Sequence, residues 1–117
     1  MHTEITKQIL KKYFKDECDL IGRENFIQLF DESSRVIEAD YGENMPIFEV
    51  IGFLVGIIGF VDSAFSLYER MTSSTEQNIK SDQFILLARK QLQIPEDVDD
   101  SVIISILEMV AKDSKEL

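Results

Sequence analysis

The chain has 117 residues, of which 44% are hydrophobic, and it carries a formal net charge of −10 at pH 7. This length and hydrophobic content predict one folded domain, residues 1–117, and exclude a disordered chain. The acidity argues against direct binding of nucleic acid, because contacts to phosphate need basic side chains. A basic protein is the partner that such a charge favours.

The negative charge is concentrated in two blocks. Residues 16–62 hold 11 acidic residues against Arg23 and Arg35, and residues 96–117 hold seven acidic residues against two lysines. Residues 1–15 instead hold one acidic residue and four lysines. The simplest interpretation is that the charge keeps the protein soluble. The functional interpretation is an acidic surface that attracts a basic partner.

The single cysteine, Cys18, excludes a disulfide within the chain and is typical of a reducing compartment. The carboxylates of Glu17 and Asp19 beside it disfavour a reactive thiolate. The N-terminus lacks the basic start and apolar run of a signal peptide, so we expect a cytoplasmic protein.

Hydrophobic spacing predicts five helices, and the first two differ in charge. The first covers about Thr3–Lys15 and carries a separate row of lysines at every fourth position, namely Lys7, Lys11 and Lys15. The second covers about Arg23–Tyr41 and ends at Gly42, a residue type that commonly follows a helix. Its outer face repeats an acidic residue every seventh position, at Glu24, Asp31 and Glu38.

The third helix, predicted over residues 46–71, opens at Pro46 and is apolar on all sides in its first half, which is typical of a helix at the centre of a bundle. A membrane span needs about 20 apolar residues. Glu49 and Asp62 enclose only 12 uncharged residues, so no span is predicted. Three glycines predict a close crossing by another helix and leave open whether the helix is continuous: Gly52, Gly56 and Gly59.

A polar loop is predicted over Thr72–Thr75, followed by helices over about Ser81–Leu92 and Asp99–Lys112. Pro95 separates these two helices, because proline interrupts the helical hydrogen-bond pattern. The sequence therefore predicts an all-α fold, a compact bundle of about five helices around a central apolar helix.

Catalysis, cofactor binding and metal binding find little support. The only histidine is His2, and a Ser–His or Cys–His pair would have to use it. No glycine-rich phosphate loop is present. Asp97–Glu108 matches several ligand positions of an EF-hand calcium loop, but Val102 stands where that loop needs glycine. The acidic start of a helix, capped by Asp99 or Asp100, is the favoured interpretation.

The acidic surface is the remaining candidate site. Carboxylates fixed on helices can pair with the Lys and Arg residues of a partner, and a nearby aromatic residue can act as an anchor. The residues of this predicted partner-binding set precede, cover and follow the second helix: Asp16, Glu17, Asp19, Glu24, Asp31, Glu32, Glu38, Asp40, Tyr41 and Glu43.

In size, acidity and helical build, with an acidic run from Asp16 to Glu43 and a helix from Arg23 to Tyr41, the chain resembles bacterial immunity proteins. These small cytoplasmic inhibitors neutralise nuclease toxins of the colicin or contact-dependent growth inhibition type. The resemblance implies a non-enzymatic inhibitor that covers a basic toxin surface, either at the active site or at an exosite. Two alternatives stay open: a self-associating structural or adaptor module that forms a homodimer through the apolar third helix, and a calcium-responsive helical protein.

Overall fold

A computed structural model describes residues 3–30, 45–75 and 81–115. The regular elements in these ranges are all helices: α1 (Thr3–Tyr13), α2 (Lys15–Ile21), α3 (Arg23–Leu29), α4 (Met45–Thr75), α5 (Ser81–Gln91) and α6 (Asp100–Lys115). The fold is therefore an all-α globule, as the hydrophobic spacing predicts.

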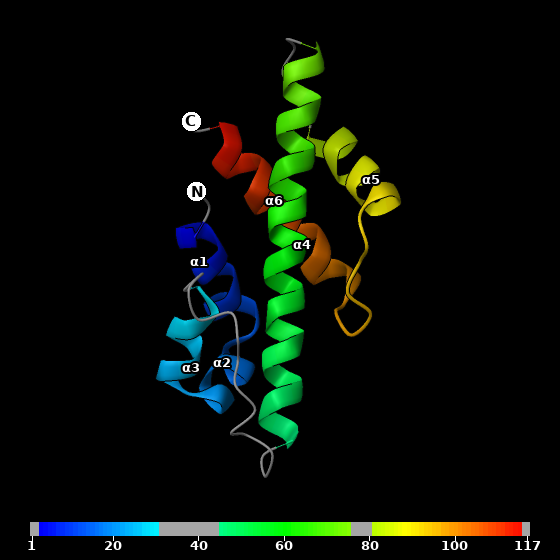
Figure 1. The fold of residues 1–117 in the computed structure, drawn as a ribbon. Coiled ribbons are helices and arrows are strands. Elements are labelled where there is room, and N and C mark those ends of the chain that lie inside the picture. The colour runs from blue at the N-terminus through cyan, green and yellow to red at the C-terminus, as the bar shows by residue number, and fades with distance from the viewer. Residues whose placement is uncertain (1–2, 31–44, 76–80, 116–117) are drawn as a thin grey trace.

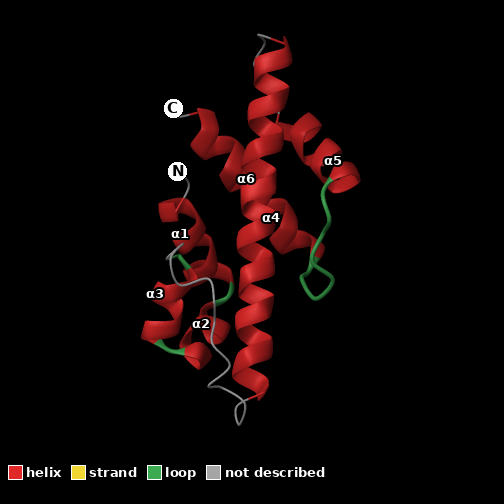
Figure 2. Cartoon of the chain, viewed as in Figure 1, coloured by secondary structure: helices red, strands yellow, loops and turns green. Residues whose placement is uncertain are grey.

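The long helix α4 runs through the middle of the molecule, and each of the other five helices contacts it (Figure 1). The helices α1, α2 and α3 lie along its first half, whereas α5 packs near its second half (Figure 2). One side of α4 is buried at a spacing of three or four residues, for example at Leu54, Ile57 and Val61, each with no exposed surface. This spacing places the side chains on one face of the helix, so α4 forms the central element of the hydrophobic core.

Aromatic pairs join the surrounding helices to α4. Phe14, between α1 and α2, meets Phe53 of α4 edge-on, with ring centres 5.5 Å apart. Tyr68 of α4 meets Phe84 of α5 in the same arrangement at 5.2 Å. Edge-to-face pairs at such distances stabilise a core beyond the area that they bury, and these two connect both ends of the bundle to one helix.

The predicted first helix, Thr3–Lys15, divides in the structure. Helix α1 ends at Tyr13, and Phe14 takes a non-helical conformation (φ −129°, ψ 38°) before α2 begins at Lys15. The break lets the Phe14 side chain enter the core, where it is 6% exposed. Residues 16–21, which belonged to neither of the first two predicted helices, are thus helical.

The predicted second helix, Arg23–Tyr41, is interrupted at Phe30. Helix α3 ends at Leu29, and Phe30 forms a turn in which its N–H donates to the carbonyl of Ile27 at 3.2 Å. A bond to the third preceding residue tightens the last turn, and Phe30 then packs edge-on against Phe26. Residues 31–44 lie outside the described part of the chain.

Helix α4 is continuous through Gly52, Gly56 and Gly59, a point that the sequence left open. All three are exposed, and a Cβ atom added at any of them would meet nothing within 4 Å. The prediction of a close helix crossing at these glycines is therefore wrong, because they lie on the side of α4 that faces away from its neighbours.

The end of α4 lies later than predicted. The helix continues to Thr75, so the expected loop over Thr72–Thr75 is helical. The Thr72 hydroxyl donates to the carbonyls of Tyr68 and Glu69 at 3.1 and 3.0 Å. This local bond satisfies the hydroxyl without leaving the helix, so the polar residues here do not end it.

By length and composition, α4 includes a stretch that could cross a membrane: within Ile47–Thr72, a window of 18 residues has a mean hydropathy of 2.1. In the structure α4 packs against five helices, and 44% of that window is buried. A helix that is apolar nearly all round can fill the core of a bundle equally well.

Candidate partner-binding surface

Helix α2 places part of the predicted acidic set on one exposed side. Asp16 and Asp19 are exposed and three residues apart, so they are neighbours on the helix surface, whereas Glu17 is half-buried. Leu20 follows Asp16 by four residues and is 54% exposed. The outer side of α2 therefore combines two carboxylates with an exposed apolar side chain.

Helix α3 repeats this combination. Glu24 is exposed in its first turn, and Ile27, three residues later, is 56% exposed. A carboxylate in the first turn also stabilises the helix, because it lies at the positive end of the helix dipole. We call five exposed residues of these two helices, Asp16, Asp19, Leu20, Glu24 and Ile27, the α2–α3 surface; Lys15, Arg23 and Gln28 are exposed on the same helices.

Gly22 joins the two helices directly. Its N–H donates to the carbonyl of Cys18 at 3.2 Å, and its carbonyl accepts the N–H of Phe26 at 3.0 Å. The residue thus ends α2 and begins α3 at once. Its φ of 86° and ψ of 163° lie in a region that essentially only glycine occupies, so glycine is what lets α3 follow α2 without a loop.

The remaining residues of the predicted set cannot be placed. Of the ten, the structure describes Asp16, Glu17, Asp19 and Glu24, and it brings these four onto consecutive helices. The other six lie outside the described residues: Asp31, Glu32, Glu38, Asp40, Tyr41 and Glu43.

Two lysines of the predicted row, Lys7 and Lys11, lie on α1 and contact aromatic rings of α3 and of the turn that follows it. The Lys7 side-chain nitrogen lies 5.4 Å from the centre of the Phe30 ring, and that of Lys11 lies 5.5 Å from the Phe26 ring. At these distances an ammonium group is attracted to the electron-rich ring face. These two lysines therefore make contacts within the chain. They also bring positive charge close to the helices that carry the acidic residues.

Cys18 lies between these opposing charges. Its thiol donates to the carbonyl of Leu10 at 3.7 Å. Burial raises the pKa of the Cys18 thiol above its ordinary value, the charges of Glu17 and Asp19 raise it further, and Lys11 lowers it in part. The direction agrees with the sequence interpretation of an unreactive thiol, although burial is a larger cause than either carboxylate.

The described residues offer no grouping that suggests metal binding or calcium response. No cluster of three or more His, Cys, Asp or Glu side chains within them could hold a metal ion. Residues 100–108 are helical, so the candidate EF-hand stretch does not form a loop. The Asp99 carbonyl accepts the N–H groups of Val102 and Ile103 at 3.0 and 3.1 Å, as expected for a residue that caps α6.

Leu20 and Ile27 are the site residues that the sequence reasoning missed. The signal was present for Ile27, because it falls outside the apolar stripe that contains Phe26, Leu29 and Phe30. For Leu20 no such signal existed, since residues 16–21 belonged to neither of the first two predicted helices.

No family model, curated protein or solved structure matches this chain. The case for function must therefore come from the residues and their arrangement.

Proposed function

We propose that this chain is an inhibitor of the immunity type, which binds a basic nuclease toxin through the α2–α3 surface and neutralises it. The observation that carries the proposal is the pairing of exposed carboxylates with exposed apolar side chains on α2 and α3. The fold offers rigid helices on which to hold them.

The two kinds of side chain would do different work in such a complex. Carboxylates attract a basic partner over a distance and speed the encounter, an effect that salt screens. Apolar side chains that become buried at the centre of an interface supply much of the binding free energy. Leu20 and Ile27 would act as the anchors, and Asp16, Asp19 and Glu24 would pair with Lys and Arg residues around them.

Inhibition would follow from occupation of the toxin's own basic residues. A nuclease needs these residues to hold the phosphates of its substrate. A protein whose carboxylates pair with them removes this contact without any chemical step. The five carboxylates of the predicted set from Asp31 to Glu43 would add to the same attraction, and Tyr41 would be a further anchor.

The test compares two variants with the same change in charge. One carries Asp16→Lys, Asp19→Lys and Glu24→Lys; the control carries Glu69→Lys, Glu96→Lys and Asp97→Lys, all exposed positions outside α1, α2 and α3. Tagged proteins are used to capture partners from the source cells, and each captured protein is identified and assayed as a nuclease with and without the wild-type chain. We expect the control to retain a basic nuclease that the wild-type chain inhibits, and the α2–α3 variant to lose it.

Two results would count against the proposal in different ways. Equal capture by both variants would show that the α2–α3 surface is not the binding site. Capture of a partner that lacks nuclease activity would support the α2–α3 surface as the binding site but contradict a nuclease toxin as the partner.

Self-association is the second candidate, because α4 carries its own exposed apolar side chains. Phe48 is 46% exposed and Val55 is 47% exposed, and the open sides of Gly52, Gly56 and Gly59 lie along the same helix. The formal charge of −10 opposes contact between two copies. Sedimentation at high salt separates the candidates: a dimer that Phe48→Ser and Val55→Ser abolish would favour self-association, and a monomer at all concentrations would exclude it.

A further inference from the structure

One side of α4 repeats exposed residues at the spacing of a coiled-coil seam. From Glu49 to Arg70 they alternate at intervals of three and four residues, which keeps them on one face of the helix. All of them are exposed, and those between the two charged ends are glycine or serine. We call these residues the α4 seam: Glu49, Gly52, Gly56, Gly59, Ser63, Ser66 and Arg70.

Contacts among the described residues do not explain the three glycines of the seam. A Cβ atom at Gly52, Gly56 or Gly59 would meet nothing within 4 Å there, so no close approach inside the described chain requires glycine. All three lie within a continuous helix, where each glycine costs about 1 kcal/mol relative to alanine. A second helix that packs closely on the seam would explain them, because glycine lets two backbones approach to a distance that a Cβ atom prevents.

The charges at the two ends make the seam complementary to itself. Glu49 is at one end, and Arg70, which is the only basic residue of α4, is at the other. In a parallel pair of α4 helices, each of these charges would meet the same charge on the second copy. In an antiparallel pair, Glu49 of each copy would lie beside Arg70 of the other, with Gly59 near the midpoint. Opposite charges at both ends therefore favour an antiparallel second copy as the occupant.

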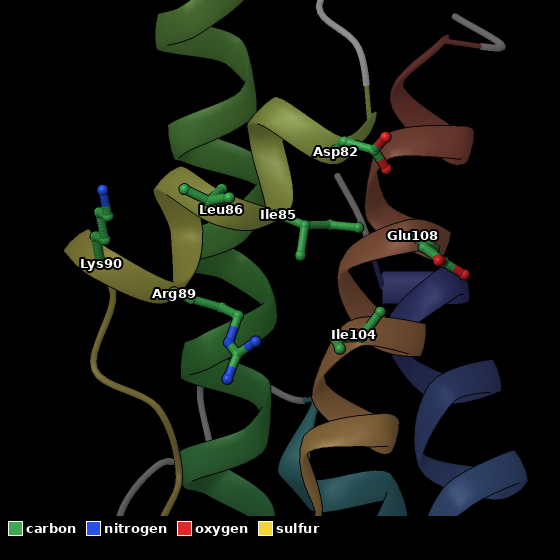
Figure 3. A pocket seen from close by; sticks show the side chains of 7 residues that line it. All are labelled: Asp82, Ile85, Leu86, Arg89, Lys90, Ile104 and Glu108. Carbon is green, nitrogen blue, oxygen red and sulfur yellow. The ribbon is translucent and has the colours of Figure 1, made fainter.

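The hollow between α5 and α6 lacks such a division of charge. Its lining includes two acidic residues, Asp82 and Glu108, and two basic residues, Arg89 and Lys90, beside apolar side chains of both helices (Figure 3). A mixed lining of this kind favours neither an acidic nor a basic occupant. The charged ends of the α4 seam are instead 21 positions apart, about 32 Å along the helix, so each can attract one opposite charge.

We propose that the α4 seam packs against the α4 seam of a second copy of this chain, antiparallel, with Gly59 near the two-fold axis. The proposal rests on the self-association candidate described above and adds to it an orientation and a register. Two-fold symmetry makes both Glu49–Arg70 pairs form together, and it places Gly52 of each copy opposite Ser66 of the other.

The strength of this contact follows from two opposing contributions. Phe48 and Val55 lie beside the seam and are 46% and 47% exposed, so their burial would favour the dimer. The formal charge of −10 on each copy opposes it, and Asp62 and Glu69 are exposed on the same helix. We therefore expect a dimer that forms at high protein concentration, whereas dilute samples stay monomeric.

Single cysteines test the orientation, because a disulfide needs Cα atoms within about 7 Å of each other. In a Cys18→Ser background, Gly52→Cys, Gly59→Cys and Ser66→Cys are made separately, with Gln83→Cys at an exposed position of α5 as the control. Under mild oxidation, Gly59→Cys alone should form a covalent dimer about tenfold faster than Gln83→Cys, since the complex raises the effective concentration of the two thiols. Gly52→Cys and Ser66→Cys should link to each other when they are mixed, and neither should link to itself.

Exchange of the end charges tests the Glu49–Arg70 pairing. Glu49→Arg should weaken the dimer about tenfold in sedimentation equilibrium, because it would face Arg70 of the second copy. Glu49→Arg together with Arg70→Glu should restore it, since the two charges are exchanged and not removed. Glu96→Arg, at an exposed position outside the helices, changes the net charge as Glu49→Arg does and should not weaken the dimer.

The possible failures can be told apart. A monomer at all concentrations, or Gly59→Cys that links no faster than Gln83→Cys, would overturn the inference. Rapid linking of Gly52→Cys to itself would leave self-association in place but would overturn the antiparallel register. Failure of the double charge exchange to restore the dimer would overturn the pairing at the ends. These measurements use the purified chain alone, so they are independent of the proposed binding of a toxin by the α2–α3 surface.

Discussion

Lys11 of α1 lies over the aromatic ring of Phe26 of α3, with its side-chain nitrogen 5.5 Å from the ring centre. Lys7 makes the same contact one helical turn earlier, over Phe30. Because α3 has only seven residues, it depends on such tertiary contacts for its stability. The lysine row of α1 thus has a structural role at the helix that carries part of the candidate binding surface.

Replacement of Lys11 tests this role. Lys11→Gln should lower the free energy of unfolding by about 0.5–1 kcal/mol, the range for an exposed cation over a ring. Lys15→Gln serves as the control, because Lys15 begins α2, where a positive charge opposes the helix dipole. Urea unfolding of both variants gives the comparison, and equal destabilisation would remove the cation–ring contact as a cause.

Gly22 and Gly56 should respond to alanine in opposite directions. Gly22→Ala should destabilise the fold by about 1–3 kcal/mol, because its φ of 86° strains any residue with a Cβ atom. Gly56→Ala should stabilise it by about 1 kcal/mol, since the position is helical and open to solvent. Thermal unfolding followed by circular dichroism measures both. A loss of stability at Gly56→Ala would mean that the exposed side of α4 contacts something in solution.

Phe84 and Phe48 allow the same substitution to be compared at a buried and at an exposed position. Phe84 has no exposed surface and packs edge-on against Tyr68, so Phe84→Ala should cost about 3–5 kcal/mol. Phe48 is 46% exposed, and Phe48→Ala should cost about 1 kcal/mol or less. Denaturant unfolding gives both values, provided that the unfolding free energies of the two variants depend on denaturant concentration with the same slope. Similar losses would contradict the packing of α5 on α4.

Cys18 should make stability fall with pH in the alkaline range. Burial raises the pKa of its thiol in the folded chain, so the unfolded chain releases its proton first as the pH rises. The contribution is complete below the pKa of the unfolded thiol and is lost as the pH rises through that of the folded one. Unfolding free energies of the wild type and Cys18→Ser across this range isolate the effect, and parallel curves would rule it out.

The same shift predicts slow chemical modification. Iodoacetamide reacts with the thiolate, so Cys18 in the folded chain should be alkylated more slowly than in urea at the same pH, and its reaction should need a higher pH. Mass spectrometry over time measures both rates. A folded rate equal to the unfolded one would show that the contacts of Cys18 with Leu10 and its surroundings do not persist in solution.

Periodic apolar spacing was enough to predict the helical class, the central place of the 46–71 segment, and the positions of α5 and α6. Helix α5 ends at Gln91 and α6 begins at Asp100, each within one residue of the expectation. These elements have strong stripes or clear boundaries at Pro95 and Asp99, so local signals and tertiary packing agree. Of the four described carboxylates in the predicted binding set, only Glu24 was expected on a helix, and the structure also places Asp16, Glu17 and Asp19 on one, α2.

The breaks in the N-terminal part depended on tertiary structure alone. Nothing in the local sequence marks Phe14 as the end of a helix, and the break exists because the Phe14 ring packs against Phe53, 39 positions later. The same holds for the contacts of Lys7 and Lys11 with α3 and for the solvent-facing glycines of α4. Hydrophobic spacing reports which residues of one helix share a face, but the partner of each face is set by the packing of the whole bundle. The sequence by itself therefore determined that this protein is a helical bundle with its acid in two blocks, and the tertiary structure decided which apolar and charged side chains were left exposed.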